Sequence, residues 1–273
     1  MRLWIQLPVV IALIGCGPRV PVDTDADADT DTDMDTDTDS DTDTDTEVDK
    51  CPEAPDAGFY GQLEAGQVTA TSPYKDSGIS AVVAAQADVV DGTPKAVDIQ
   101  VTDAVVASIG YTPSSATAHW SVWVADSKGA VRTYLKDSTG TIPSTVKPGD
   151  TISFKVKQLT NFAGEFQISQ ITDFALGADT SLIWLQETNG TTLSYADHGR
   201  ELVHAYGQVV TDPAACGSYE CMDLDLDGQT VDFRIKPEKG VVKGDCLDVV
   251  APVGVFNGGV QFNIDNFDWV DFY

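Results

Sequence analysis

The sequence is poor in positive charge. It contains 16 lysine and arginine residues against 43 aspartate and glutamate residues, a formal net charge of −27 at pH 7. Residues 23–49 alone carry 14 acids and no base, and Arg2 and Arg19 precede them. Residues 50–273 therefore keep 29 acids and 14 bases, a net charge of −15. Binding to nucleic acid without regard to sequence depends on lysine and arginine against phosphate, so this balance counts against it.

Histidine and catalytic motifs are also scarce. The chain has three histidines, His119, His198 and His204, and it lacks a Gly-x-Ser-x-Gly elbow, a phosphate-binding loop and a His-Glu-x-x-His pair. His119 lies beside an aromatic segment and is expected to pack there. His198 and His204 flank Glu201 as a metal cluster would, but the corresponding stretch earlier in the chain has no histidine. We therefore expect no enzyme and no catalytic residues.

The apolar run at the N-terminus, Leu3–Leu13, is too short to cross a bilayer as a helix. It leads into Leu-Ile-Gly-Cys at Leu13–Cys16. This tetrapeptide resembles the lipobox of bacterial lipoproteins, which implies that residues 1–15 are a signal peptide and that Cys16 becomes the acylated first residue. Gly17 stands where inner-membrane lipoproteins carry aspartate, so the resemblance implies the outer membrane. A plain secretion signal with a chance cysteine is the alternative.

The next segment, residues 16–50, is mostly of low complexity. From Asp23 to Asp49 every odd position is acidic, and no apolar face exists. Such a segment buries too little apolar surface to offset the entropy of ordering, so we expect disorder. Repulsion between like charges should extend it, to at most about 90 Å. We interpret it as a stalk that holds a folded domain off the membrane, with diffuse calcium binding as a compatible role.

Four cysteines remain once Cys16 is assigned to lipid: Cys51, Cys216, Cys221 and Cys246. An even number of cysteines in an oxidising compartment predicts two disulfides, and three connectivities are open. A zinc site is the weaker alternative, because no pair has the two-residue spacing of a zinc knuckle and no histidine lies near them.

The folded part favours strands over helices. Valine, isoleucine, threonine and aromatic residues alternate with polar residues in short runs, which glycine, proline, aspartate and asparagine separate. An internal repeat organises these runs. Each copy has an opening strand, a loop, a hairpin of two strands, a Gly-Asp-led strand, a Phe-x-Gly turn and a last strand, with a glutamine three residues after the glycine of that turn. The matching segments are 97–110 with 201–212, 119–137 with 219–237, and 147–174 with 243–269.

Each copy thus contains five strands. This order resembles the OB-fold, a small Greek-key barrel, and more closely the OB modules of secreted and lipid-anchored bacterial proteins. The resemblance implies an all-β chain with two tandem OB-fold-like five-stranded barrels, at residues 95–190 and 198–273, behind the disordered stalk. Residues 51–94 match neither copy and are expected to pack on the first barrel. A single β-sandwich is the alternative fold.

The segment Asp223–Gly228, Asp-Leu-Asp-Leu-Asp-Gly, has two interpretations. Its acids and glycine begin a calcium loop, but position twelve should be glutamate and is Arg234. The alternation of aspartate with apolar residues favours a strand with one buried face, and its Asp-Gly end suits a tight hairpin turn. We therefore expect a hairpin. A looser calcium site made by Asp223, Asp225 and Asp232 on the outer face is kept as the candidate metal site.

Ligands of OB-folds are expected on the face of the second and third strands. In the first copy Trp123, Arg132 and Tyr134 should point outward from this face, with Trp120 and Val122 pointing inward. Such a group can stack a sugar, a base or an aromatic side chain, so it is the candidate ligand site. Alternatively, Trp123 and Tyr134 are a cross-strand pair covered by the N-terminal extension or the other barrel.

These features together predict a surface-anchored lipoprotein that acts as a binding module. Its expected partners are a membrane, through the lipid anchor, and a glycan, a peptide or an envelope protein, with calcium as a candidate ion. One alternative is a structural or assembly lipoprotein with calcium-stabilised barrels. Another is an OB protein for single-stranded nucleic acid, which the acidic charge disfavours. The functional part of this prediction rests on analogy, since one fold hosts many functions.

Overall fold

The computed structural model describes residues 51–52, 58–112, 117–136, 140–188, 191–199, 201–264 and 267–273. The expected signal peptide, Cys16 and the acidic stalk lie outside these residues. None of the helices in the described part has the length and apolar character needed to cross a bilayer.

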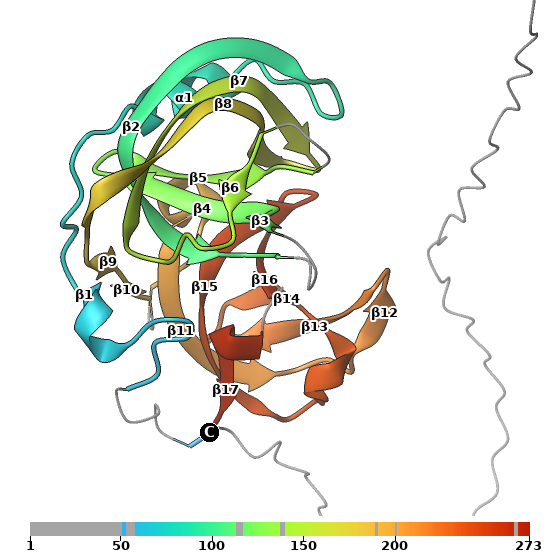
Figure 1. The fold of residues 1–273 in the computed structure, drawn as a ribbon. Coiled ribbons are helices and arrows are strands. Elements are labelled where there is room, and N and C mark those ends of the chain that lie inside the picture. Colours follow the sequence, from blue (N-terminus) through green and yellow to red (C-terminus); the bar gives the residue numbers. More distant parts are fainter. Residues whose placement is uncertain are drawn as a thin grey trace, which may run out of the picture. The chain divides into compact units, whose positions relative to one another are not determined.

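The first half of the folded part is a closed five-stranded barrel (Figure 1). The strand order is β2-β4-β5-β8-β7, and β7 pairs with β2 to close the ring. Neighbouring strands are antiparallel except for β5 and β8, which are parallel. The strands are β2 (Lys95–Ile109), β4 (Ser121–Asp126), β5 (Gly129–Tyr134), β7 (Asp150–Phe162) and β8 (Glu165–Thr180).

The second half repeats this arrangement. β11 pairs with both β13 and β15, which closes the ring β11-β13-β14-β16-β15, and β14 and β16 form the parallel pair. The order first-second-third-fifth-fourth in both rings is that of the OB-fold. The expected all-β fold with two tandem OB barrels is therefore confirmed, in place of a single sandwich. The strands are β11 (Leu202–Val209), β13 (Tyr219–Asp225), β14 (Thr230–Ile235), β15 (Cys246–Phe256) and β16 (Gly259–Ile264).

Three two-residue hairpin turns explain the repeated x-Gly sequences. Asp227 and Gly228, between β13 and β14, both have positive φ, 55° and 97°. Turns with two positive φ values match the twist of the flanking strands, and glycine adopts the second position without strain. The other two turns, Ala163-Gly164 and Asn257-Gly258, have the same geometry. The segment Asp223–Gly228 is therefore a strand and hairpin, as the alternation predicted.

The residues before β2 contact both barrels, and not only the first as expected. In α1 (Ile79–Gln86), Ile79 and Val82 are fully buried in the core of the first barrel. The Asp126 carboxylate fixes the start of this helix by accepting the backbone N–H of Ile79 at 3.0 Å. Leu63, by contrast, packs with Val250 of β15. The wider contact arises because apolar residues of this segment fall on both sides of the junction between the barrels.

Short elements complete the chain between and around the barrels. β9 pairs with β1 and β10 pairs with β11, so backbone hydrogen bonds hold the connection between the two barrels. These and the other short elements are η1 (Ala65–Gln67), β1 (Val68–Thr69), β3 (Ala118–His119), β6 (Ile142–Pro143), β9 (Ile183–Trp184), β10 (Gln186–Glu187), α2 (Tyr195–His198), β12 (Ala214–Cys216), η2 (Pro237–Lys239), η3 (Phe267–Trp269) and β17 (Val270–Phe272).

Each barrel has a core of its own. Phe154 is fully buried in the core of the first barrel, and Phe233 and Phe262 are fully buried in the core of the second. Met222 and Leu224 of β13 are buried in the second core, which confirms the inward face that the Asp-Leu alternation predicted.

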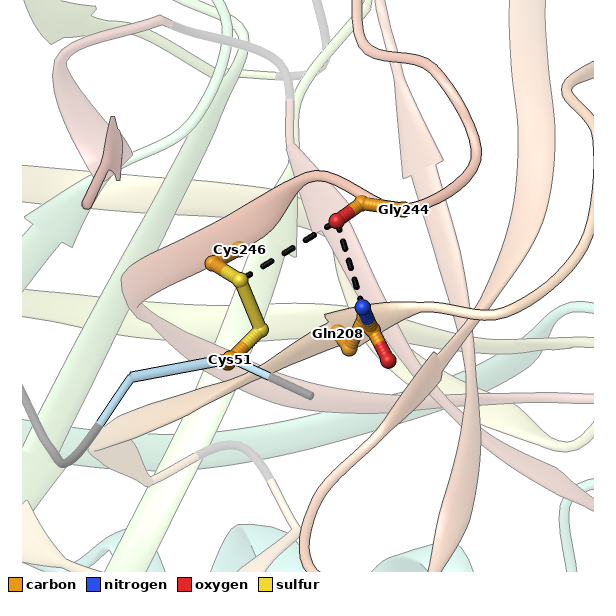
Figure 2. The surroundings of a disulfide bond; sticks show 4 residues. All are labelled: Cys51, Gln208, Gly244 and Cys246. Atoms are coloured by element: carbon orange, nitrogen blue, oxygen red, sulfur yellow. Dashed lines mark hydrogen bonds between the residues drawn. A yellow bond between two sulfur atoms is a disulfide. The ribbon is translucent and has the colours of Figure 1, made fainter. Parts of the chain in front are cut away.

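Two disulfides join the four cysteines. Cys51 bonds to Cys246 at the start of β15, and Cys216 bonds to Cys221 within the β12–β13 hairpin. Figure 2 shows the first of these beside the Gln208 side chain, whose amide donates a hydrogen bond of 3.3 Å to the Gly244 carbonyl. The expected use of the cysteines as two disulfides is confirmed, and the open connectivity is settled.

Candidate ligand-binding cleft

A cleft of about 540 Å³ lies between the two barrels, and both contribute to its walls. This volume is within the range of about 300–1,000 Å³ typical of small-molecule sites. The residues that line it are Gly92, Tyr111, Trp120, Arg132, Tyr134, Thr160, Asn161, Phe162, Glu165, Gln167, Tyr219, Arg234, Lys236, Phe256, Gln261 and Asn263.

Both barrels present the ligand face of the OB-fold to this cleft. The lining residues come mainly from the third and fifth strands of each barrel and from the end of each fourth strand beside the hairpin that follows it, and Tyr219 adds the second strand of the second barrel. Strands two and three and the adjoining loops are where OB-folds bind oligonucleotides and oligosaccharides. The repeated motif explains this symmetry, because its phenylalanine (Phe162 and Phe256) and its glutamine (Gln167 and Gln261) line the cleft in both copies.

Exposed aromatic rings gather around the cleft. The described residues include nine exposed large hydrophobic side chains, and four of these, Tyr111, Tyr134, Phe162 and Phe256, line it. Phe162 is the most open of the four, at 61% exposure. Isolated exposed hydrophobic residues are ordinary, but a group of them around one concave surface indicates a binding site.

The two hairpins that carry the phenylalanines touch each other. The rings of Phe162 and Phe256 lie 6.2 Å apart between centroids. The backbone N–H of Asn257 donates to the Ala163 carbonyl at 2.8 Å, which links the turn of one barrel to the turn of the other. This contact therefore joins the first-barrel and second-barrel walls of the cleft directly.

Arg132 lies in the cleft wall, but its charge is neutralised. Its guanidinium Nη1 is 3.0 Å from Glu165 Oε2 in a buried salt bridge, and its Nε donates to Ser121 Oγ at 2.9 Å. Removing one partner of a buried pair leaves an uncompensated charge, which is strongly destabilising. Of the predicted ligand residues, Arg132 is therefore a structural part of the cleft wall, whereas Tyr134 presents an exposed aromatic ring to the cleft.

Trp123 lies behind the cleft and does not line it. Its side chain is only 3% exposed and packs into the core of the second barrel, with its ring 5.6 Å from that of Trp269 in an edge-on contact. The second barrel thus covers Trp123, which is the alternative arrangement that the strand pattern left open. Trp120, expected to point inward, lines the cleft instead, where its ring stands 5.6 Å from Tyr111. Trp120 precedes β4, so the strand alternation does not reach it.

The second barrel contributes a cationic wall that the sequence analysis missed. The Arg234 guanidinium carbon and Lys236 Nζ each lie 4.0 Å from the centroid of the Tyr219 ring. Arg234 stands beside Asn263 in the register of β14 and β16. A signal was present in the repeat alignment, because Arg234 occupies the position that corresponds to Tyr134 of the proposed first-barrel site.

The charge of the cleft is opposite to that of the folded part. Three cations, Arg132, Arg234 and Lys236, and one acid, Glu165, line it. The local balance of +2 contrasts with the −15 of residues 50–273. Four amide side chains, Asn161, Gln167, Gln261 and Asn263, add both hydrogen-bond donors and acceptors.

The three aspartates of the candidate calcium site do not form a metal-binding group. Asp223 and Asp232 face each other across β13 and β14, and burial, followed by the charge of Asp223, raises the pKa of Asp232. Asp225 accepts the backbone N–H of Gly228 at 2.8 Å and so serves the turn. Within the described ranges, no set of three or more His, Cys, Asp or Glu side chains is arranged to hold a metal ion.

The histidines have structural partners. His119 Nε2 is 2.9 Å from the Val146 carbonyl. His204 lies between two carboxylates, with Nδ1 2.7 Å from Glu187 and Nε2 2.6 Å from Asp248. Burial lowers the pKa of His204, but the hydrogen bonds and charges of Asp248 and Glu187 outweigh burial and raise it above 6.5.

Comparisons with known proteins give only distant structural likeness. No protein-family model and no curated protein matches the sequence. Among solved structures, the tetrameric p202 HIN2 domain is 14% identical with a TM-score of 0.31, covering 67% of this chain and 96% of that one. A murine DNA-binding protein bound to double-stranded DNA is 9% identical with a TM-score of 0.32, covering 65% and 97%. Similarity at this level carries no functional argument.

Proposed function

We propose that this chain is a lipid-anchored binding module that takes an oligosaccharide in the cleft between its two OB barrels. The observation that carries the proposal is the convergence of exposed aromatic rings and amide side chains, from equivalent positions of both barrels, on one concave surface. The lipobox-like Leu13–Cys16 and the acidic segment support the anchored part of the proposal. They would hold the cleft off an outer membrane by up to about 90 Å.

A carbohydrate matches the composition of the cleft. Sugar rings offer apolar C–H faces that stack on aromatic side chains, and Trp120, Tyr134 and Phe162 supply such surfaces. Sugar hydroxyls donate and accept hydrogen bonds, and the amides of Asn and Gln do both. The mixture of rings and amides is therefore better suited to a sugar than to a purely apolar molecule.

A long nucleic acid fits less well. Single strands are bound by grooves whose positive charge follows the backbone over several nucleotides. Here the positive balance of the cleft is +2, and the folded part around it is net −15. Electrostatic repulsion beyond the cleft would oppose a polyanion that extends past its ends, whereas a short ligand meets only the lining residues.

Calorimetric titration of the full chain in detergent with a panel of neutral and acidic oligosaccharides, and with single-stranded oligonucleotides, tests the proposal. Phe162→Ala removes an exposed cleft ring, and Phe272→Ala, which removes an exposed ring on β17 outside the cleft, is the matched control. We expect Phe162→Ala to weaken saccharide binding roughly fivefold, about 1 kcal/mol of stacking, and Phe272→Ala to leave it unchanged.

Two results would contradict the proposal. If oligonucleotides bind in a salt-dependent manner and saccharides do not, the module is a nucleic-acid binder despite its charge. If neither class binds while an envelope protein is retained through the cleft rim, the assembly role is correct. Equal effects of Phe162→Ala and Phe272→Ala on saccharide binding would place the site elsewhere.

A further inference from the structure

The second-barrel wall of the cleft concentrates positive charge on one ring. Arg234 and Lys236 are two residues apart on the same face of the chain, and both charged groups lie 4.0 Å from the centre of the Tyr219 ring. Contact with an aromatic face stabilises a cation but does not neutralise it. The two like charges therefore remain close together at this wall.

On the opposite wall, by comparison, the charge of Arg132 is neutralised by a carboxylate. Arg132 meets Glu165 at 3.0 Å in a buried pair. In the described part of the chain, by contrast, the structure gives neither Arg234 nor Lys236 a salt bridge. The chain has 43 acids, so a carboxylate partner would be easy to supply. The cleft keeps these two cations free of one.

Two buried polar atoms at this wall also have no partner. Arg234 Nε and Asn263 Oδ1 are inaccessible to solvent and make no hydrogen bond within the described residues. The two residues are register partners on β14 and β16, and both line the cleft. Buried polar groups almost always have a hydrogen-bond partner. The described residues therefore leave part of the hydrogen-bonding capacity of Arg234 and Asn263 unused at the wall of the cleft that both residues line.

We propose that the cleft selects acidic oligosaccharides and that Arg234 and Lys236 hold a sugar carboxylate beside Asn263. This inference rests on the proposed saccharide-binding function and specifies its ligand. An arginine fork binds a carboxylate with two parallel hydrogen bonds, and the neighbouring amide is placed for the adjacent ring hydroxyl. The aromatic rings of the first-barrel wall take the apolar faces of the sugar rings. A uronic acid unit supplies the carboxylate, the hydroxyl and the ring.

The net charge of the protein makes this subsite a selective one. A carboxylate ligand that approaches a folded part of net charge −15 is repelled over most of the surface. Within the cleft, Arg234 and Lys236 attract it. Binding should therefore depend on a few cations at short range, and its dependence on salt concentration should be shallow.

The test uses trimers of galacturonic and mannuronic acid and their neutral methyl esters, titrated calorimetrically into the full chain in detergent. The variants are Arg234→Met and Lys236→Met, with Lys243→Met as the control, because Lys243 is an exposed lysine of the same barrel outside the cleft. We expect the native chain to bind an acid trimer at least tenfold more tightly than its ester. Each cleft variant should reduce this ratio severalfold, and Lys243→Met should leave the ratio unchanged.

The outcomes separate this inference from the proposed function. If acid and ester bind equally, the carboxylate subsite is wrong and saccharide binding stands. If neither form of either trimer binds and neutral sugars also fail, the proposed function itself is wrong. If Arg234→Met does not fold, as a thermal melt would show, Lys236→Met decides alone, because the partly exposed Lys236 is replaceable without opening the core.

Discussion

Removal of the Cys51–Cys246 disulfide should destabilise the protein far more than removal of the Cys216–Cys221 disulfide. The two bonds differ mainly in the loop they close, since their sequence separations are 195 and 5 residues. A disulfide limits the conformational entropy of the unfolded chain, and the limitation grows with the logarithm of loop length. The chain-entropy relation gives about 5 kcal/mol for the long loop and about 2 kcal/mol for the short one.

Urea unfolding under non-reducing conditions measures both effects. The Cys51→Ala/Cys246→Ala and Cys216→Ala/Cys221→Ala variants are compared with the native chain, and the free energy of unfolding is extrapolated to water. We expect a loss near 5 kcal/mol for the first and near 2 kcal/mol for the second. An equal loss, or a larger loss for the short loop, would refute the entropic reasoning and show that local contacts of the bridges dominate.

Two further predictions concern the folded part. Because the pKa of His204 is raised in the folded state, the stability that its charged form contributes should be full below about pH 6.5 and lost as the pH rises through the raised pKa. Thermal melts from pH 5 to 9 should show this decline, and His204→Gln should flatten it. A His204→Gln profile identical to that of the native chain would exclude a stabilising role for the contacts of His204 with Asp248 and Glu187. Trp123→Ala should lower the free energy of unfolding by about 3–5 kcal/mol, because its ring is buried against Trp269. Tyr134→Ala, at a partly exposed ring, should cost less than about 1 kcal/mol in the same urea titration, and similar losses for the two variants would place Trp123 outside the core.

Most of the fold could be predicted from the sequence because the sequence contains two copies of the same strand pattern. The shared Gly-Asp, Phe-x-Gly and glutamine positions define equivalent strands, and two copies distinguish a structural pattern from chance. The buried face of β13 followed from its alternation, and Met222 and Leu224 are buried as that alternation requires. These inferences succeed because the alternation of side chains between the two faces of a strand is a local property of the chain.

The site could be predicted only in part, because it forms between the copies. Trp123 and Tyr134 share one face of a hairpin, yet the second barrel covers Trp123 and leaves Tyr134 open. Alternation assigns a side chain to a face, but it does not state what covers that face. Tyr219 and Arg234 were missed for the same reason, since each barrel was interpreted alone.

The position of the Cys51–Cys246 bond also determines how the molecule carries mechanical load. In a chain anchored at Cys16 as proposed, tension on a bound ligand passes through residue 50 to Cys51 and then directly across the disulfide into β15. The 195-residue separation is thereby bypassed, and the first barrel is not in series with the tether. β15 is held along its length by β11, β16 and β17. The load on β15 is therefore shared among its pairs with three other strands.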